Sequence, residues 1–129
     1  MGKIERFEDI AAWKKARELT KAIYEVTAQG RIAHDFSLRD QLRRASTSIM
    51  ANIAEGFERD GNKEFRQFLA TAKGSVGEVK ALLYVALDAG LATSEQVNRL
   101  MALSEETSRI LAGFLRYLKD SDKKGIKFK

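Results

Sequence analysis

The chain has 129 residues, a formal net charge of +5, no Pro and no Cys. This length is typical of a single domain with a core of its own. The absence of Cys excludes a disulfide framework, a thiolate zinc site and a cysteine nucleophile, and it suits the reducing cytoplasm, where we expect the protein to reside. The sequence starts without the apolar run of a signal peptide, and no segment approaches the ~20 apolar residues of a membrane span.

The basic excess is concentrated at the end of the chain. Residues 123–129 hold four Lys and no acid, which leaves 19 basic and 18 acidic residues elsewhere. The composition therefore does not predict a surface built as a whole for nucleic acid. We expect residues 122–129 to form a disordered, Lys-rich tail. Its candidate contacts for a polyanion are Lys123, Lys124, Lys127 and Lys129.

Apolar residues recur at helical spacing in four segments, at about residues 9–29, 37–58, 62–89 and 94–120. Strong helix formers are abundant throughout the chain. The connections between the segments are short, and short connections make sequential helices antiparallel neighbours. The sequence therefore predicts an all-α fold over residues 1–121, an up-down-up-down antiparallel four-helix bundle.

Cap and turn residues mark the expected helix ends. Ser37, with Asp40 three residues later, is expected to cap the second helix, and Asn62 the third. Thr93 and Gln96 match a capping box at the start of the fourth helix. The expected stops are Gly30 for the first helix and Gly90 for the third.

Two glycines, Gly74 and Gly77, interrupt the middle of the third helix. Each costs roughly 1 kcal/mol relative to Ala in an exposed helix interior. Their presence predicts the close approach of another backbone, with a bend or hinge as the alternative.

The second helix carries a line of polar residues beside its apolar face, which consists of Leu42, Ala45, Ile49 and Ile53. We call this line, with two residues of the third helix, the polar seam: Arg44, Ser48, Asn52, Glu55, Ser75 and Glu78. If these groups are buried they must be paired, and Arg44 with Glu78 or Glu55 is the natural pairing. The favoured interpretation is a structural device that sets the register of helices or subunits, and the alternative is a ligand site.

Basic residues form two short stripes. Lys14, Arg17 and Lys21 share one side of the first helix, and Arg39 and Arg43 are one turn apart on the second. Such stripes are usually solvated faces. On a symmetric oligomer, however, they repeat and become a ring of charge that can hold phosphates.

The residues of a catalytic or metal site are not apparent. A di-metal bundle needs paired Glu-x-x-His motifs, whereas this chain has one His, His34, in an expected loop. Ser46, Thr47 and Ser48 lack the adjacent base that a nucleophile requires. We therefore expect no enzyme, no metal and no cofactor.

The chain resembles the four-helix bundle proteins encoded by intervening sequences in large-subunit (23S) rRNA genes. The resemblance extends in order from Phe7 to about Leu118, and Asn52-Ile53-Ala54-Glu55-Gly56 is its most specific part. The other matching segments are Phe7-Glu8-Asp9-Ile10, Trp13-Lys14-Lys15-Ala16, Leu19, Ser37-Leu38, Gln41-Leu42-Arg43-Arg44-Ala45, Ser48-Ile49, Lys63-Glu64-Phe65, Phe68-Leu69, Ala72, Gly74-Ser75 and Glu78.

That family is similar in fold to the accessory protein of diversity-generating retroelements, which assembles as a barrel-like homopentamer and binds nucleic acid. The resemblance therefore implies a bacterial protein that forms a homopentamer, and it implies RNA or DNA as a partner less directly.

These observations predict a non-enzymatic, oligomeric bundle that binds a nucleic-acid backbone or acts as a scaffold. Arg17, Lys21, Arg39, Arg43 and the tail lysines would contact phosphate, with Lys14 beside them. The alternative is a module that binds a protein partner and no nucleic acid. A membrane partner is not expected.

Overall fold

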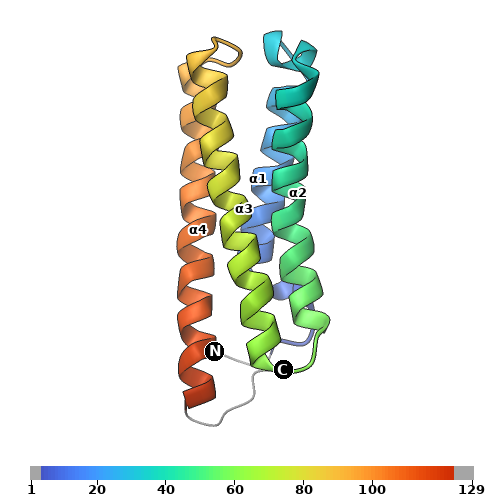
Figure 1. Ribbon diagram of the computed structural model, residues 1–129, viewed down its shortest axis with the longest axis vertical. Coiled ribbons are helices and arrows are strands. Elements are labelled where there is room, and N and C mark those ends of the chain that lie inside the picture. The colour runs from blue at the N-terminus through green and yellow to red at the C-terminus, as the bar shows by residue number, and fades with distance from the viewer. Residues whose placement is uncertain (1–3, 124–129) are drawn as a thin grey trace.

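The four stretches of helical spacing form four α-helices in the computed structural model, which describes residues 4–123 (Figure 1). They are α1 (Ala11–Thr27), α2 (Phe36–Glu58), α3 (Asn62–Asp88) and α4 (Ser94–Lys123). Two short 3-10 helices, η1 (Phe7–Asp9) and η2 (Arg31–His34), precede α1 and α2. Consecutive helices run in opposite directions, which confirms the predicted all-α bundle. Across residues 4–123, no helix has both the length and the apolar character that a membrane span requires.

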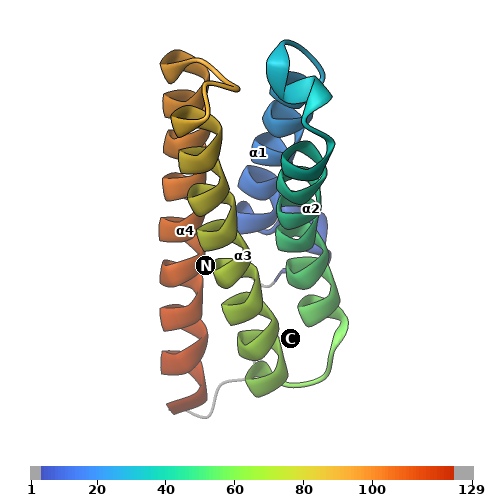
Figure 2. The ribbon, with the colours of Figure 1, turned by 45° about the horizontal axis from the view of Figure 1, so that its top comes forward.

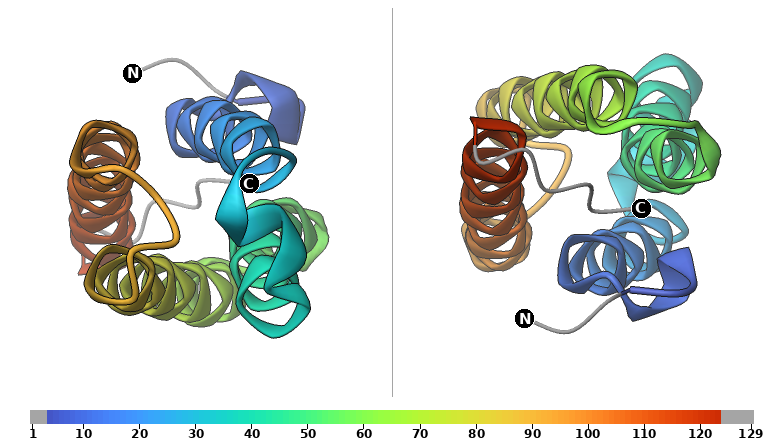
Figure 3. Two further views of the ribbon diagram at one scale, coloured as in Figure 1. Left: turned by 90° about the horizontal axis from the view of Figure 1, so that it is seen from above. Right: turned by 90° about the horizontal axis from the view of Figure 1, so that it is seen from below.

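The helices stand at the corners of a square when the bundle is viewed along its axis (Figure 3). Each helix packs against its neighbours in the chain, and α4 also packs against α1, which closes the square. In Figure 2, α1 lies beside α2 and α3 lies beside α4 along most of their length. The bundle therefore has four outer edges, α1–α2, α2–α3, α3–α4 and α4–α1.

The core lies along the central axis and consists of the apolar faces that the sequence predicts. The whole predicted face of α2, from Leu42 to Ile53, is buried. Phe65 of α3 is fully buried and packs edge-to-face against Phe57 of α2 and Phe114 of α4. The middle of α4 instead buries two hydroxyls, which donate to carbonyls of their own helix: Ser104 Oγ to Leu100 O at 2.8 Å and Thr107 Oγ1 to Leu103 O at 2.7 Å. The helix thereby satisfies these polar groups itself.

The capping predictions are correct for α4 and wrong for α2. Thr93 and Gln96 bond reciprocally, with Thr93 N donating to Oε1 at 2.9 Å and Gln96 N donating to Thr93 Oγ1 at 3.0 Å. In α2 the cap is Asp35 rather than Ser37, because the Asp35 carboxylate accepts from Leu38 N at 3.0 Å. Asp35 is thus the N-cap residue, and its side chain accepts from the N–H of the third helical residue, Leu38.

Two further helix ends are set by glycine. Gly61, rather than Asn62, is the N-cap of α3, and Asn62 is a buried first residue of the helix. The prediction that α3 stops at Gly90 is confirmed. Gly90 has a φ of 67°, its N–H donates to Leu87 O, and Leu91 N donates to Ala86 O, which together form a Schellman motif.

The close packing predicted at Gly74 and Gly77 is wrong. A Cβ built on either glycine meets no heavy atom within 4 Å, and both residues are exposed on the outer side of α3. The tightly packed glycine is Gly56 of α2, where an added Cβ would lie 2.6 Å from Phe68 Cβ and 3.0 Å from Phe65 Cδ1. The close contact between α2 and α3 therefore lies near the end of α2 and the beginning of α3, not at the middle of α3.

Candidate nucleic-acid interface

Part of the polar seam joins α2 to α3 by direct hydrogen bonds. The hydroxyls of Ser48 and Ser75 lie 3.1 Å apart across the α2–α3 edge. Asn52 Nδ2 donates to the Ser48 carbonyl at 2.9 Å and lies 3.1 Å from Ser48 Oγ. All three side chains are half-buried. These residues form a link of the kind predicted for register between helices.

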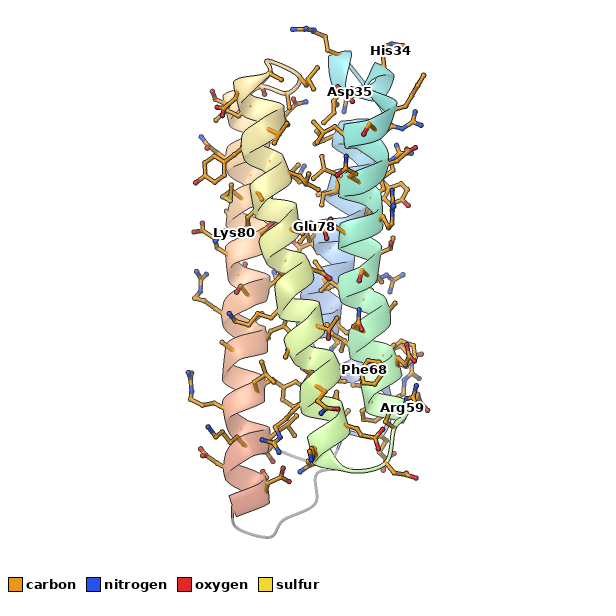
Figure 4. The ribbon with its side chains drawn as sticks, in the orientation of Figure 1. His34, Asp35, Arg59, Phe68, Glu78 and Lys80 are labelled. Atoms are coloured by element: carbon orange, nitrogen blue, oxygen red, sulfur yellow. The ribbon has the colours of Figure 1, made fainter. Side chains whose placement is uncertain are left out.

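The charged members of the polar seam are exposed, and the predicted pairing of Arg44 is wrong. Within residues 4–123, no carboxylate lies within 4.0 Å of the Arg44 guanidinium, and Glu55 pairs instead with Arg59 at 2.9 Å. Glu78 is exposed on the side of α3 that faces α2 (Figure 4). The exposed Glu55 and Arg44 therefore do not form a buried ion pair.

Helix geometry explains why the polar seam divides in this way. A four-residue step advances about 40° around the helix axis, so residues at that spacing drift around the helix rather than staying in line. The drift brings Ser48 and Asn52 toward the buried face and leaves Arg44 furthest from it. The three-residue step from Asn52 turns Glu55 back toward solvent.

The α1 stripe is an exposed row of cations. Lys14, Arg17 and Lys21 all face solvent, and none of them lies within 4.0 Å of a carboxylate in the described part of the chain. The Arg17 guanidinium lies over the Trp13 ring, 5.7 Å from its centroid, in a cation–π contact. These three cations remain available to a ligand.

The α2 stripe meets the α1 stripe through Arg43. Its Nε donates to Thr27 Oγ1 at 2.9 Å, and its guanidinium lies 4.6 Å from the centroid of the Tyr24 ring. Arg43 therefore extends the α1 row onto α2. We call Lys14, Arg17, Lys21 and Arg43 the α1–α2 basic face.

Arg39 is largely occupied by contacts near the start of α2. Its Nε lies 2.9 Å from Asp40 Oδ1, its Nη1 donates to Ala33 O at 3.2 Å, and its guanidinium stacks 4.8 Å from the Phe36 ring centroid. Of the predicted tail contacts, Lys123 is the last residue of α4, so the helix extends three residues beyond its expected end at 120. Lys124, Lys127 and Lys129 lie outside the described residues.

Lys15, although it is next to the α1 stripe, serves to join two helices. Its Nζ lies 2.9 Å from Glu18 Oε2 on α1 and 3.4 Å from Glu106 Oε1 on α4. The hydrogen bond with Glu18 is the main cause that raises the pKa of Lys15, against the lowering effect of burial. The ammonium is therefore charged at neutral pH and already paired.

Sequence reasoning missed a basic groove on the α3–α4 edge. The groove has a volume of about 590 Å³. We call it the α3–α4 basic groove, and it is lined by Lys63, Arg66, Gln67, Ala70 and Lys73 of α3 and by Ala112, Leu115, Arg116 and Lys119 of α4. Five of these nine side chains are cationic and none is acidic.

Most of the cations in the groove have no counter-ion within residues 4–123. Arg66 Nη2 lies 2.8 Å from Asp122 Oδ2, whereas its buried Nε has no hydrogen-bond partner among residues 4–123. For the other four, Lys63, Lys73, Arg116 and Lys119, no described carboxylate lies within 4.0 Å. An arrangement of this kind can hold the oxygens of an anion.

The signal for this groove was present in the sequence but was split between two segments. Lys63, Arg66 and Lys73 are spaced three and seven residues apart, which places them on one side of a helix. Arg116 and Lys119 are one turn apart near the end of α4. Only the antiparallel packing of α3 and α4 brings the two sets together.

The described residues contain no group of three or more His, Cys, Asp or Glu that could hold a metal ion. His34 is exposed at the end of η2. The Ser46 and Thr47 hydroxyls donate to backbone carbonyls of their own helix three residues back, at 3.0 Å each. Hydroxyls of Ser and Thr in a helix commonly bond to a carbonyl of the preceding turn in this way.

Comparison with known proteins places the chain among small helical proteins of one family. Residues 8–113 match the family model described as 23S rRNA-intervening sequence protein. A crystal structure of a protein of unknown function from the S23 ribosomal protein family of Bacteroides thetaiotaomicron is 23% identical, with a TM-score of 0.74. The match covers 81% of this chain and 98% of the other, and at this identity it supports the fold alone. No curated protein matches the chain.

Proposed function

The chain belongs to the 23S rRNA-intervening sequence protein family, and from this premise we propose that it is a non-enzymatic, self-associating bundle that binds the phosphodiester backbone of nucleic acid. The observation that carries the proposal is the α3–α4 basic groove. We place this activity in the bacterial cytoplasm, in keeping with the absence of Cys from the sequence.

The groove suits a nucleic-acid backbone because few protein carboxylates compete with phosphate for its cations. An ion pair within the protein would have to be broken before a phosphate could bind, and within residues 4–123 only Arg66 of the groove has such a pair. Phosphate contacts by Lys and Arg release condensed counterions, which is the main source of non-specific affinity for nucleic acid. The nearly neutral charge of residues 1–122 does not oppose this role, because basic residues are gathered on particular edges of the bundle.

The chemistry of the groove also limits what can be recognised. Among the described residues, no aromatic side chain lines it, and its apolar lining consists of Ala70, Ala112 and Leu115. Single-stranded bases are usually held by stacking on aromatic rings, whereas phosphate contacts carry no sequence information. We therefore propose that binding depends on charge and shape rather than on sequence.

We expect binding of a structured RNA or a DNA duplex to weaken steeply with salt. If all five groove cations contact phosphate, the logarithm of affinity should fall with the logarithm of salt at a slope of about −4.5. Lys73→Gln combined with Arg116→Gln removes one cation from each wall, so the slope should become shallower by about 2. We expect the affinity at 100 mM salt to fall at least tenfold, measured by fluorescence anisotropy.

The matched control is Lys80→Gln combined with Arg99→Gln, which removes the same charge from the same two helices outside the groove. Lys80 faces α4, where its Nζ lies 4.0 Å from Glu105 (Figure 4). An unchanged slope in the control, with a shallower slope in the groove variant, supports the proposal. Absence of binding at low salt, or equal slopes in the two variants, contradicts it.

We propose that assembly uses the other two edges of the bundle. The α2–α3 edge carries the polar seam, of which Arg44 and Glu78 are exposed. The opposite α4–α1 edge carries a groove of about 380 Å³, lined mainly by apolar residues that include Ile10, Ile110 and Phe114. Contact between two different edges of neighbouring copies is heterologous, and a heterologous contact generates a closed ring when its rotation closes.

The expected solution mass is five times the 14.5 kDa of one chain, as the resemblance to the homopentameric accessory protein implies. Light scattering coupled to size-exclusion chromatography measures this mass directly. A monomeric mass at micromolar concentration would contradict self-association and would leave the nucleic-acid proposal to be judged on the groove alone.

A second candidate function is a protein-interaction module without nucleic acid. The observation that favours it is a pair of adjacent exposed apolar side chains on α3, Tyr84 at 58% and Val85 at 50% exposure. Exposed apolar residues of this size can anchor a partner. Such a module would show little affinity for either RNA or DNA at low salt, which separates it from the first proposal.

A further inference from the structure

Two basic surfaces lie on opposite edges of the bundle. The α1–α2 basic face belongs to one edge and the α3–α4 basic groove to the other. Each helix contacts its neighbours around the square, and α1 and α3 stand at diagonal corners (Figure 3). The two surfaces therefore share no helix and no residue, and they face in opposite directions.

The distance between the surfaces allows both to be occupied. Each α-helix with its side chains is about 10 Å across, so ligands on opposite edges are separated by roughly two helix diameters, or ~20 Å. Electrostatic interactions are screened over about 10 Å at 0.1 M salt. A polyanion bound on one edge therefore repels a second on the opposite edge only weakly.

Both surfaces suit the same class of ligand. On the α1–α2 basic face, Arg17 lies over the half-buried ring of Trp13 and Arg43 lies over the ring of Tyr24, which is 42% exposed. The rings hold the guanidinium groups in place, and the exposed ammonium groups of Lys14 and Lys21 lie along the same row. Because a guanidinium already covers one side of each ring, this face, like the groove, presents mainly cations, and its ligand is the phosphate-lined exterior of a duplex.

We infer that a single bundle holds two duplex segments at once, one on the α1–α2 basic face and one in the α3–α4 basic groove, and so bridges them. The inference rests on the proposed function, because it assumes that the groove binds a backbone. It adds a second binding surface and an activity, the pairing of nucleic-acid segments, which simple backbone binding does not include.

A capture experiment with two short duplexes tests this inference. One 20-base-pair duplex is fixed to beads, protein is bound to it, and a second, fluorescent duplex of unrelated sequence is added at 50 mM salt. The full chain should retain the second duplex. Two variants each remove one surface: Lys14→Gln with Lys21→Gln, and Lys73→Gln with Arg116→Gln. Each should still bind the first duplex but retain at least tenfold less of the second. The experiment is run with an RNA duplex and with a DNA duplex.

The control separates failure of bridging from failure of binding. Lys80→Gln with Arg99→Gln should retain the second duplex as the unchanged protein does.

An oligomer that uses one surface per copy would also bridge two duplexes. In that case one of the two surface variants would bridge normally, and that result would overturn the inference. Binding of the first duplex without capture of the second overturns it as well, while leaving the proposed function intact. If no duplex binds at all, the proposed function fails too. All substituted side chains lie outside the core, and thermal unfolding checks that each variant is folded.

Discussion

Replacing Phe65 with alanine is expected to lower the free energy of unfolding by about 4 kcal/mol. Phe65 is fully buried at the end of the bundle where α2, α3 and α4 meet. Its ring centroid lies 6.0 Å from that of Phe57 and 5.4 Å from that of Phe114, both in edge-to-face orientation. The substitution removes apolar burial, leaves a cavity and breaks both aromatic contacts. Urea denaturation followed by circular dichroism measures the change.

The matched control for this prediction is Phe36→Ala. Phe36 is 60% exposed at the start of α2 and contacts the guanidinium of Arg39. Loss of an exposed cation–π contact costs about 0.5–1 kcal/mol. Equal effects of the two substitutions would contradict the placement of Phe65 at the centre of the core.

Replacing Gly56 with alanine is expected to destabilise the bundle by about 2 kcal/mol, even though alanine is the better helix former. The new Cβ would lie 2.6 Å from Phe68 Cβ, an atom fixed to the backbone of α3 rather than the end of a flexible side chain. The two helices would have to move apart, which would loosen the packing around Phe65. The free energy of unfolding from urea titration tests this expectation.

Gly74→Ala provides the opposite expectation within the same bundle. Gly74 is helical and exposed, and an added Cβ meets nothing within 4 Å. The substitution should therefore stabilise α3 by up to about 1 kcal/mol through helix propensity. If both glycine variants changed stability in the same direction, the contrast between a tightly packed and an open glycine would be wrong.

The positions of the helices could be predicted from the sequence because apolar periodicity is a local property. The faces containing Leu42, Ile49 and Leu69 are buried as expected, and the observed helix bounds differ from the expected ones by at most three residues. The capping box at Thr93 was identified correctly because both partners lie within one turn. Where the competing cap was a residue outside the expected helix, as at Asp35, the prediction failed.

Features that depend on the relative placement of helices could not be predicted in the same way. Gly56 and Gly74 are both glycines within helical segments, and only the path of α3 decides which one meets another backbone. The sequence places the polar seam beside the apolar face but does not say which of its members are buried, and the rotation of each helix buries Ser48 and Asn52 in part and exposes Arg44. The α3–α4 basic groove combines side chains such as Lys63 and Lys119, which are far apart in the sequence.

The closure of the square by α1 and α4 has a consequence for folding. The other main packing contacts among the four α-helices of residues 4–123 join neighbours in the chain, and such local topologies fold in microseconds to milliseconds because little loop entropy is lost before contacts form. The pairing of α1 with α4 is the main long-range step among the α-helices of residues 4–123. During synthesis on the ribosome, three helices emerge with an open apolar side. The final helix must arrive before water is excluded from the core.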